Sequence, residues 1–308
     1  MTSRISFGTK PLLARPISGF RTDLWRAGST LNRGRKKVSC ALPGLEKVRI
    51  GCSGWSYKDW VGPFYPPKTE AKDYLKLYSR TFDCVEIDSS FYRIPSPGMV
   101  SQWKNSTPDG FTFCPKLTKK ITHENKLANF ESTLLYFYSV ISKLGSKLGP
   151  IVVQLPPSVK VEKHKAAMER FVSSLEPKFK HAIEFRHKSW FTPETYKLLE
   201  KNNVAMAWSI NQYLETPPEV TADFVYLRMV GTREITKFTG IQKEMRDEME
   251  HWATELKEKR ASIHDSFVFF NNHFAGFGPE SANEFRRLLG MIEVGWSKGQ
   301  ESTQATLL

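Results

Sequence analysis

The feature that most constrains the fold of this chain is the alternation of short β-rich runs with amphipathic helical segments. Alternation of this kind favours parallel pairing of the strands through right-handed crossovers. Eight such units fit within residues 45–291, and closed α/β barrels commonly take about 250 residues as one domain. We therefore predict a single-domain α/β fold, a (β/α)8 TIM-like barrel. The predicted strands are residues 48–52, 84–88, 111–116, 151–155, 182–185, 204–208, 224–229 and 267–271.

Amphipathic patterns predict a helix after most of these strands. The link at residues 210–223 is the exception: it contains Pro217 and Pro218, and we expect no full helix there. The predicted helices are residues 70–81, 97–106, 130–147, 162–175, 193–201, 242–259 and 279–291.

A doubly wound open sheet is the competing fold. Its phosphate-binding turn is rich in glycine, and Gly51-x-x-Gly54 is too short and too common a pattern to stand for it. The barrel is therefore the favoured architecture.

Polar side chains gather near the C-terminal ends of the predicted strands. Because side chains alternate across a strand, Glu86 shares a face with Cys84, Glu184 with Ala182, and Arg228 with Tyr226. We expect the strand face that carries these polar residues to point into the barrel. The opposite face, which carries the bulkier apolar side chains, is expected to pack on the helices. Barrel enzymes place their chemistry at the C-terminal mouth, so a functional site is expected there.

The ordered motifs of the domain resemble those of the DUF72 family, the YecE-like proteins. They run GCSGWSYKDWVGPFYP, VEIDSSFYRIP, KLTKKITHE, VVQLPPS, AIEFRHKSW, YLRMVG and FFNNHFAGFGP, and they cover about residues 47–290. The resemblance implies a TIM-like barrel of unknown function. Three positions depart from the family pattern: Asp88 stands where Asn is usual, Asn211 lies where an Asp is frequent, and Val230 replaces the His before Gly231.

A pair of carboxylates is the first candidate for chemistry. Glu184, with Glu86 as its partner, is a candidate acid or base of the kind that glycosidases use. The alternative is structural, with Glu86 paired to Lys116 and Glu184 paired to Arg186 or Arg228.

A second group of residues is suited to holding a ligand. Guanidinium groups donate two parallel hydrogen bonds to a carboxylate or phosphate, so several cations at one mouth favour an anionic ligand. Histidines in loops more often bond to backbone, and the aromatic residues either stack on a ligand or cap the barrel core. The candidate substrate-binding residues are Lys116, His123, Gln154, Arg186, His187, Trp190, Arg228, Asn271, Asn272, Trp55 and Tyr92.

Metal and thiol chemistry have weaker signals. The seven histidines form no HExxH motif and no close pair, although Glu86, Asp88 and Glu184 offer oxygen ligands to a hard cation such as Mg²⁺. No metal ligand set is predicted. The four cysteines show no CxxC spacing and no sign of structural disulfides, as in a reducing compartment.

The basic character of the chain is concentrated near its N-terminus. Residues 1–40 hold nine basic residues and one acid, so they account for +8 of the net charge of +13. Their Ser- and Arg-rich composition predicts that residues 1–44 form a transit peptide for a chloroplast or mitochondrion. The alternatives are a disordered basic arm of a cytoplasmic protein or an incorrect start site. Residues 292–308 are expected to form a polar C-terminal tail.

We expect an enzyme of the hydrolase or lyase type that acts on a small anionic or sugar-like substrate at the mouth. A nucleic-acid-binding or nuclease-like barrel is one alternative, although the charge of +5 outside the N-terminal segment is modest for extensive phosphate contact. A non-catalytic ligand-binding barrel is the other. No apolar run approaches the roughly 20 residues of a membrane span, and no membrane partner is expected.

Overall fold

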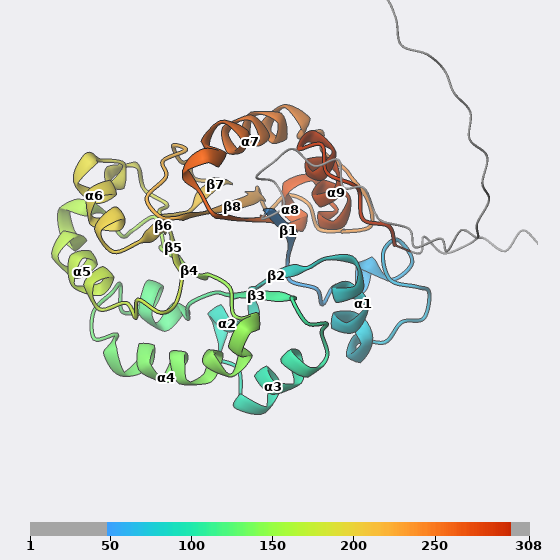
Figure 1. Ribbon diagram of the computed structural model, residues 1–308, viewed down its shortest axis with the longest axis horizontal. Helices are drawn as coiled ribbons and strands as arrows, with labels where there is room; N and C mark the ends of the chain where they lie inside the picture. Colours follow the sequence, from blue (N-terminus) through green and yellow to red (C-terminus); the bar gives the residue numbers. More distant parts are fainter. Residues whose placement is uncertain (1–47, 297–308) are drawn as a thin grey trace, which may run out of the picture. The chain divides into compact units, whose positions relative to one another are not determined.

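A computed structural model describes residues 48–296 of the chain (Figure 1). The expected transit peptide and residues 297–308 of the expected tail lie outside the described residues. Within residues 48–296, no helix is both long enough and apolar enough to cross a membrane.

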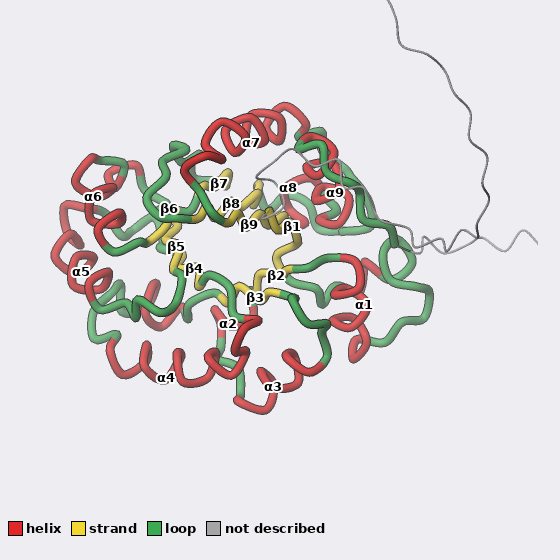
Figure 2. The backbone as a smooth tube through the Cα atoms, viewed as in Figure 1, coloured by secondary structure: helices red, strands yellow, loops and turns green. Residues whose placement is uncertain are grey.

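The strands form a ring with helices around its outside, as Figure 2 shows in yellow and red. Every pairing between neighbouring strands is parallel. The strands are β1 Val48–Ser53, β2 Cys84–Ile87, β3 Thr112–Pro115, β4 Ile151–Gln154, β5 His181–Glu184, β6 Val204–Met206, β7 Trp208–Asn211, β8 Phe224–Gly231 and β9 Asp265–Phe270.

Two details close the ring. The sixth predicted strand is divided at Ala207: β6 pairs with β5, whereas β7 pairs with β8. Between β3 and β4 the pairing is reduced to bridges, one of which joins Lys116 to Val152. Because β1 also pairs with β9, the ladder returns to its start and the predicted barrel is confirmed.

The principal helices occupy the predicted segments. Ser96 and Thr192 cap two of them, since their hydroxyl groups accept hydrogen bonds from the backbone N–H of Met99 and Thr195. The link at residues 210–223 has no helix, as its prolines predicted. The helices are α1 Tyr74–Thr81, α2 Ser89–Tyr92, α3 Pro97–Asn105, α4 Glu131–Ile141, α5 Val161–Ser173, α6 Pro193–Lys201, α7 Arg246–Lys259, α8 Asn272–Ala275 and α9 Gly278–Leu288.

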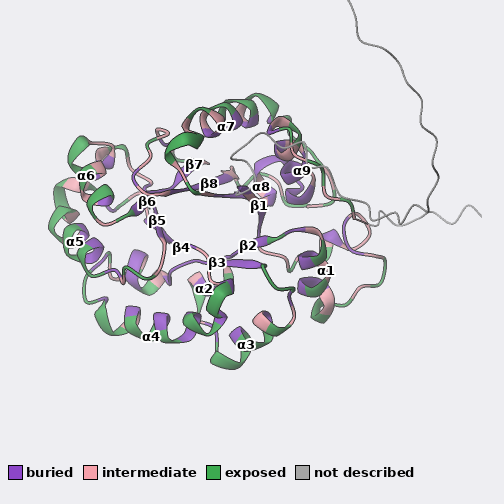
Figure 3. Cartoon of the chain, in the orientation of Figure 1, coloured by how far each residue is buried: buried purple, intermediate pink, exposed green. Residues whose placement is uncertain are grey.

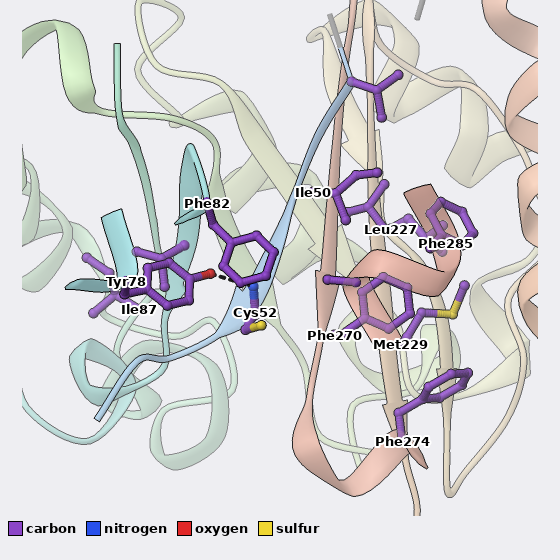
Figure 4. Close-up of a cluster of buried hydrophobic side chains, with 14 of the residues drawn as sticks. Ile50, Cys52, Tyr78, Phe82, Ile87, Leu227, Met229, Phe270, Phe274 and Phe285 are labelled. Carbon is purple, nitrogen blue, oxygen red and sulfur yellow. Dashed lines mark hydrogen bonds between the residues drawn. The ribbon is translucent and has the colours of Figure 1, made fainter. Parts of the chain in front are cut away.

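Two apolar layers hold the barrel together. The interior contains small side chains such as Cys84, Ala182 and Ala205 beside Tyr226 and Phe269. A larger layer packs between the strands and the helices, and Figure 4 shows part of it, with the hydroxyl of Tyr78 accepting a hydrogen bond from the backbone N–H of Cys52. Figure 3 shows the buried residues along the strands and on the inner faces of the helices. The predicted division into inward and outward faces is therefore found on these strands.

The packed chain continues past the boundary expected at residue 291. The indole N–H of Trp296 donates to the carbonyl of Pro63 at 2.8 Å, and its ring lies against Phe64. The backbone N–H of Val294 donates to the side chain of Asn283. Residues 292–296 of the expected tail therefore fold back onto the domain.

Candidate functional site

A cavity of about 320 Å³ opens at the C-terminal mouth of the barrel, where the sequence placed a site. Its lining comes from residues at or just after the C-terminal ends of the strands. They are Tyr57, Asp88, Tyr92, Lys116, Gln154, Arg186, Asn211, Gln212, Tyr213, Arg228, Val230, Gly231, Arg233, Phe238, Asn271, Asn272 and His273.

Arg228 on β8 is the centre of the polar network beneath this cavity. Its Nε and Nη2 donate to the two oxygens of Glu86 at 2.8 and 2.7 Å. Its Nη1 donates to Glu184 and, at 3.2 Å, to Gln154. Burial opposes the charge of Arg228, but Glu184 and Glu86 together raise its pKa well above the ordinary value. This guanidinium is therefore a permanent cation.

Glu86 on β2 has no free oxygen directed at the cavity. Besides the two bonds from Arg228, Oε1 accepts from the hydroxyl of Ser53 at 3.0 Å and Oε2 from that of Tyr226 at 2.8 Å. The residue is 0% exposed and is absent from the cavity lining. The structural pairing considered for Glu86 thus involves Arg228 and not Lys116.

Glu184 on β5 is held between two arginines. One oxygen accepts from Nε of Arg186 at 2.6 Å and the other from Nη1 of Arg228. Burial alone would raise the pKa of Glu184, but the charges of Arg186, Arg228 and Lys116 lower it to about 2. Like Glu86, it lies under the cavity rather than in its lining.

Arg186 and Gln154 connect this network to the cavity. Gln154 Oε1 accepts from Nη2 of Arg186 at 2.8 Å as well as from Arg228. Arg186 has five N–H groups, and its bonds to Glu184 and Gln154 use two of them. The other three have no hydrogen-bond partner within residues 48–296. The centre of the Tyr213 ring lies 5.3 Å from Cζ of the Arg186 guanidinium. Arg186 therefore presents unused donors at the mouth.

Lys116 and Asp88 form a second ion pair in the lining. Lys116 Nζ lies 3.4 Å from Asp88 Oδ1 and 4.6 Å from the centre of the Phe91 ring. The hydroxyl of Ser90 fixes the backbone here, since it accepts from the N–H of Lys116 and its single O–H lies within 2.8 Å of the carbonyl oxygens of Ile87 and Lys116. Burial lowers the pKa of Lys116, although Asp88 opposes this effect.

The two candidate histidines do not line the cavity. His123 Nδ1 bonds to the hydroxyl of Thr122 at 2.9 Å, and its ring lies edge-on to Phe91. Burial and the charges of Lys116 and Arg186 lower the pKa of His123 to about 4. His187 Nδ1 bonds to Ser189. Both imidazoles have the local partners that histidines in loops commonly have.

Two of the candidate tryptophans belong to the outer apolar layer. Trp190 stacks on Phe185, and its indole N–H donates to the carbonyl of Val159 at 2.8 Å. Trp55 lies edge-on to Trp103 and Phe113. Both residues were expected at the mouth, but neither lines the cavity. Their side chains pack against other aromatic residues of the outer layer instead. Tyr92, by contrast, lines the mouth and is 68% exposed.

The amides that follow β9 lie where the sequence placed them, in the cavity lining. Asn271 Oδ1 accepts from the backbone of His273 at 3.0 Å. Asn272 Oδ1 accepts from Trp60 Nε1 and from the backbone N–H of Gly278, so its Nδ2 is fixed as the donor. That Nδ2 is buried and has no partner in the described part of the chain.

Several lining residues were not among the candidates. Tyr213, Arg233 and Phe238 belong to the loops after β7 and β8, which no strand period reaches, and Tyr57 lies in the loop after β1. All three departures from the DUF72 pattern, at Asp88, Asn211 and Val230, line the cavity. The positions at which this chain differs from the family pattern are therefore positions of the mouth.

The arrangement does not favour a metal centre. Residues 48–296 contain no group of three or more His, Cys, Asp or Glu side chains that are placed to hold a metal ion. Glu86 and Glu184 direct their oxygens at Arg228, so they do not form an oxygen cage with Asp88. Cys52, Cys84 and Cys114 are free and buried.

Comparisons with known proteins agree with this description. The family model for "Protein of unknown function DUF72" matches residues 49–305. The UPF0759 protein YunF of Bacillus subtilis is 27% identical over 278 residues, which span 81% of this chain and 96% of YunF. The UPF0759 protein YecE of Escherichia coli is 30% identical over 144 residues, 47% of this chain and 50% of YecE.

Solved structures show the same fold. A DUF72 family protein of Thermotoga maritima superposes with a TM-score of 0.67 and 25% identity, and the match covers 79% of this chain and 99% of that protein. A second one, from Enterococcus faecalis, has a TM-score of 0.67 at 20% identity, covering 82% and 99%. With most of its length matched by the family model, this chain belongs to the DUF72 family.

Proposed function

We propose that the barrel mouth binds a small anionic, sugar-like substrate and that the protein is an enzyme of the hydrolase or lyase type. The observation that carries this proposal is the set of unused donors of Arg186 beside Lys116 in one cavity. A guanidinium with free N–H groups in a partly desolvated site is suited to a carboxylate or phosphate.

The charge of the site supports an anionic ligand. Lys116, Arg186, Arg228 and Arg233 line the cavity, and among residues 48–296 Asp88 is the only acid that lines it. Glu86 and Glu184 beneath them neutralise part of this charge, and one positive charge remains for the whole group. A ligand of charge −1 or −2 would therefore enter a site that attracts it.

The remaining lining supports a ligand with hydroxyl groups. Amide side chains can both donate to and accept from a hydroxyl, and five of them line the cavity: Gln154, Asn211, Gln212, Asn271 and Asn272. A volume of about 320 Å³ suits a compact metabolite rather than a polymer.

We assign Glu86 and Glu184 a positioning role in place of the acid and base that their pairing first suggested. Both are buried and bonded at each carboxylate oxygen, and the low pKa of Glu184 makes it a weak base at neutral pH. They hold Arg228 and Arg186 in fixed orientations. Among the described residues, the carboxyl and amino groups that line the cavity are those of Asp88 and Lys116.

A thermal-shift screen of the full chain tests the proposal. The library should hold phosphorylated sugars, sugar acids and small carboxylates, with and without divalent metals. A ligand present at about 100 times its Kd adds about 2.7 kcal/mol of stability, which raises the Tm by roughly 5–10 °C. No shift with any anionic compound would overturn the proposal. Binding only to single-stranded or duplex nucleic acid, weakening steeply with salt, would favour the alternative function instead.

A further inference from the structure

The arrangement around Lys116 points to more than anion binding, and the inference that follows rests on the proposed function. Lys116 stands just past the end of β3, and its side chain is 9% exposed at the cavity. Its ammonium group has an ion-pair partner on one side and the Phe91 ring on the other. An amine in such partly apolar surroundings is a candidate nucleophile.

The groups around this amine set its chemistry. Asp88 and Phe91 come from the segment after β2, Arg228 comes from β8, and Glu86 and Glu184 act from beneath. Burial lowers the pKa of Lys116 and Arg228 lowers it further, whereas the three carboxylates raise it. The surroundings therefore increase the fraction of neutral amine at a given pH.

A single oxygen links the amine to an anion-binding group. Oδ1 of Asp88 lies 3.4 Å from Lys116 Nζ and 3.9 Å from Arg228 Nη2. Four of the five N–H groups of Arg228 have hydrogen-bond partners, and the second N–H of Nη2 has none within the described residues. The amine and a guanidinium with an unused donor thus lie on either side of one contact, each within 4 Å of the same carboxylate oxygen.

We propose that Lys116 forms a Schiff base with the carbonyl carbon of a 2-oxo acid whose carboxylate is held by Arg228 and Arg186. In such an acid the carboxylate is bonded directly to the carbonyl carbon, which suits an amine and a guanidinium that flank the same oxygen of Asp88. The neutral amine of Lys116 attacks that carbon, and the new C–N bond replaces the C=O bond. The carbonyl oxygen leaves as water after it takes up two protons, one relayed by Asp88 from the amine nitrogen and one from solvent. The nitrogen keeps its second hydrogen, so the product is the protonated imine.

The protonated imine is an electron sink, and it places the protein among lyases rather than hydrolases. Breaking a bond at the carbon next to the imine carbon leaves an electron pair that the imine nitrogen accepts. No oxidant or metal is needed for this step. Asp88 lies within reach to return the proton.

Reductive trapping tests this inference. The full chain is incubated with pyruvate or glyoxylate, reduced with sodium borohydride and mapped by peptide mass spectrometry. We expect one reduced adduct, on Lys116, at an occupancy at least tenfold above that of exposed lysines such as Lys119. Lys116→Arg should lose this adduct and Lys119→Arg should keep it.

Two results separate this inference from the proposed function. Pyruvate that raises the Tm while Lys116 stays unlabelled would overturn the Schiff base and leave anion binding in place. Neither a Tm shift nor an adduct, with any anionic compound tried, would overturn both. Because the wild-type map is decisive alone, the test holds even if Lys116→Arg fails to fold.

Discussion

Arg228 and Glu86 form a fork of two parallel hydrogen bonds across the barrel interior, from Nε to Oε2 at 2.8 Å and from Nη2 to Oε1 at 2.7 Å. The two residues come from β8 and β2, which are separated in the sheet by β1 and β9. Both side chains are almost fully buried, at 2% and 0% exposure. Glu86 and Glu184 together hold the guanidinium of Arg228 in place, and Glu184 also holds that of Arg186.

Removing Arg228 should be the costliest single change in the site. Arg228→Met leaves Glu86 and Glu184 buried without their common partner, and breaking a buried ion pair in this way costs about 3–5 kcal/mol. Urea unfolding should show this loss. Arg246→Met is the control, because Arg246 is exposed and pairs with Glu250 at the surface, where a pair contributes about 1 kcal/mol or less. Equal effects of the two variants would contradict the central role of Arg228.

Arg186 should matter for binding more than for folding. Arg186→Lys keeps the charge but loses the fork, so affinity for an anionic ligand found by the thermal-shift screen should fall about 10- to 100-fold. Lys188→Gln, an exposed neighbour, should leave affinity unchanged. Titration calorimetry gives both values. Undiminished affinity in Arg186→Lys would show that the guanidinium fork is not used.

Glu184→Gln separates a positioning role from acid–base catalysis. Glutamine keeps an oxygen that can accept from Arg186 or Arg228, but it removes the charge. We expect ligand affinity to weaken by about tenfold and the pH profile of any turnover to keep its shape. Loss of the acidic or basic limb of that profile, with unchanged affinity, would restore Glu184 as the acid or base.

His181 should make the protein sensitive to acid. Burial lowers the pKa of His181 to about 4 from 6.5, and its Nε2 bonds to the hydroxyl of Tyr138 at 2.8 Å. The unfolded chain then binds more protons than the native state between pH 6.5 and 4, so stability falls as the pH is lowered through this range. Wild type should lose roughly 3 kcal/mol more than His181→Gln between pH 7 and 4. If the free energy of unfolding fell equally with pH in the two proteins, His181 would not be the source of the acid sensitivity.

Gly231 shapes the rim of the cavity. Its φ is +71°, and a Cβ at this position would lie 2.5 Å from the carbonyl oxygen of His273. Gly231→Ala should therefore cost more stability than Gly110→Ala, whose φ is +84° but whose Cβ meets nothing within 4 Å. Both variants have the backbone strain of about 1–2 kcal/mol, and only Gly231→Ala should also weaken ligand binding. Equal melting temperatures and affinities would contradict this expectation.

The barrel and the inward-facing set could be predicted because both follow from a simple period. Alternation along β2, β5 and β8 places Glu86, Glu184 and Arg228 on the inner face, and strand order then brings them together. The partners considered for Glu184, namely Arg186 and Arg228, are those that it has. The partner of Glu86 could not be predicted, because the pairing of Glu86 with Arg228 in place of Lys116 depends on the reach of Arg228 across the ring.

The residues beyond the strand ends were the least predictable. Trp190 follows Phe185 closely in sequence, yet a turn folds it back into the outer layer. Tyr213 and Arg233 reach the mouth from loops without periodicity. In such loops the position of a side chain depends on tertiary contacts, such as that between Tyr213 and Arg186.

The most direct test of the account is a crystal structure with an anionic ligand identified by the thermal-shift screen. We predict that the anionic group lies in the mouth, within hydrogen-bonding distance of the guanidinium of Arg186, with Lys116 Nζ beside the rest of the ligand. A ligand bound elsewhere, for example in a second cavity lined by Met99 of α3 and Tyr136 of α4, with the mouth filled only by solvent, would contradict the account.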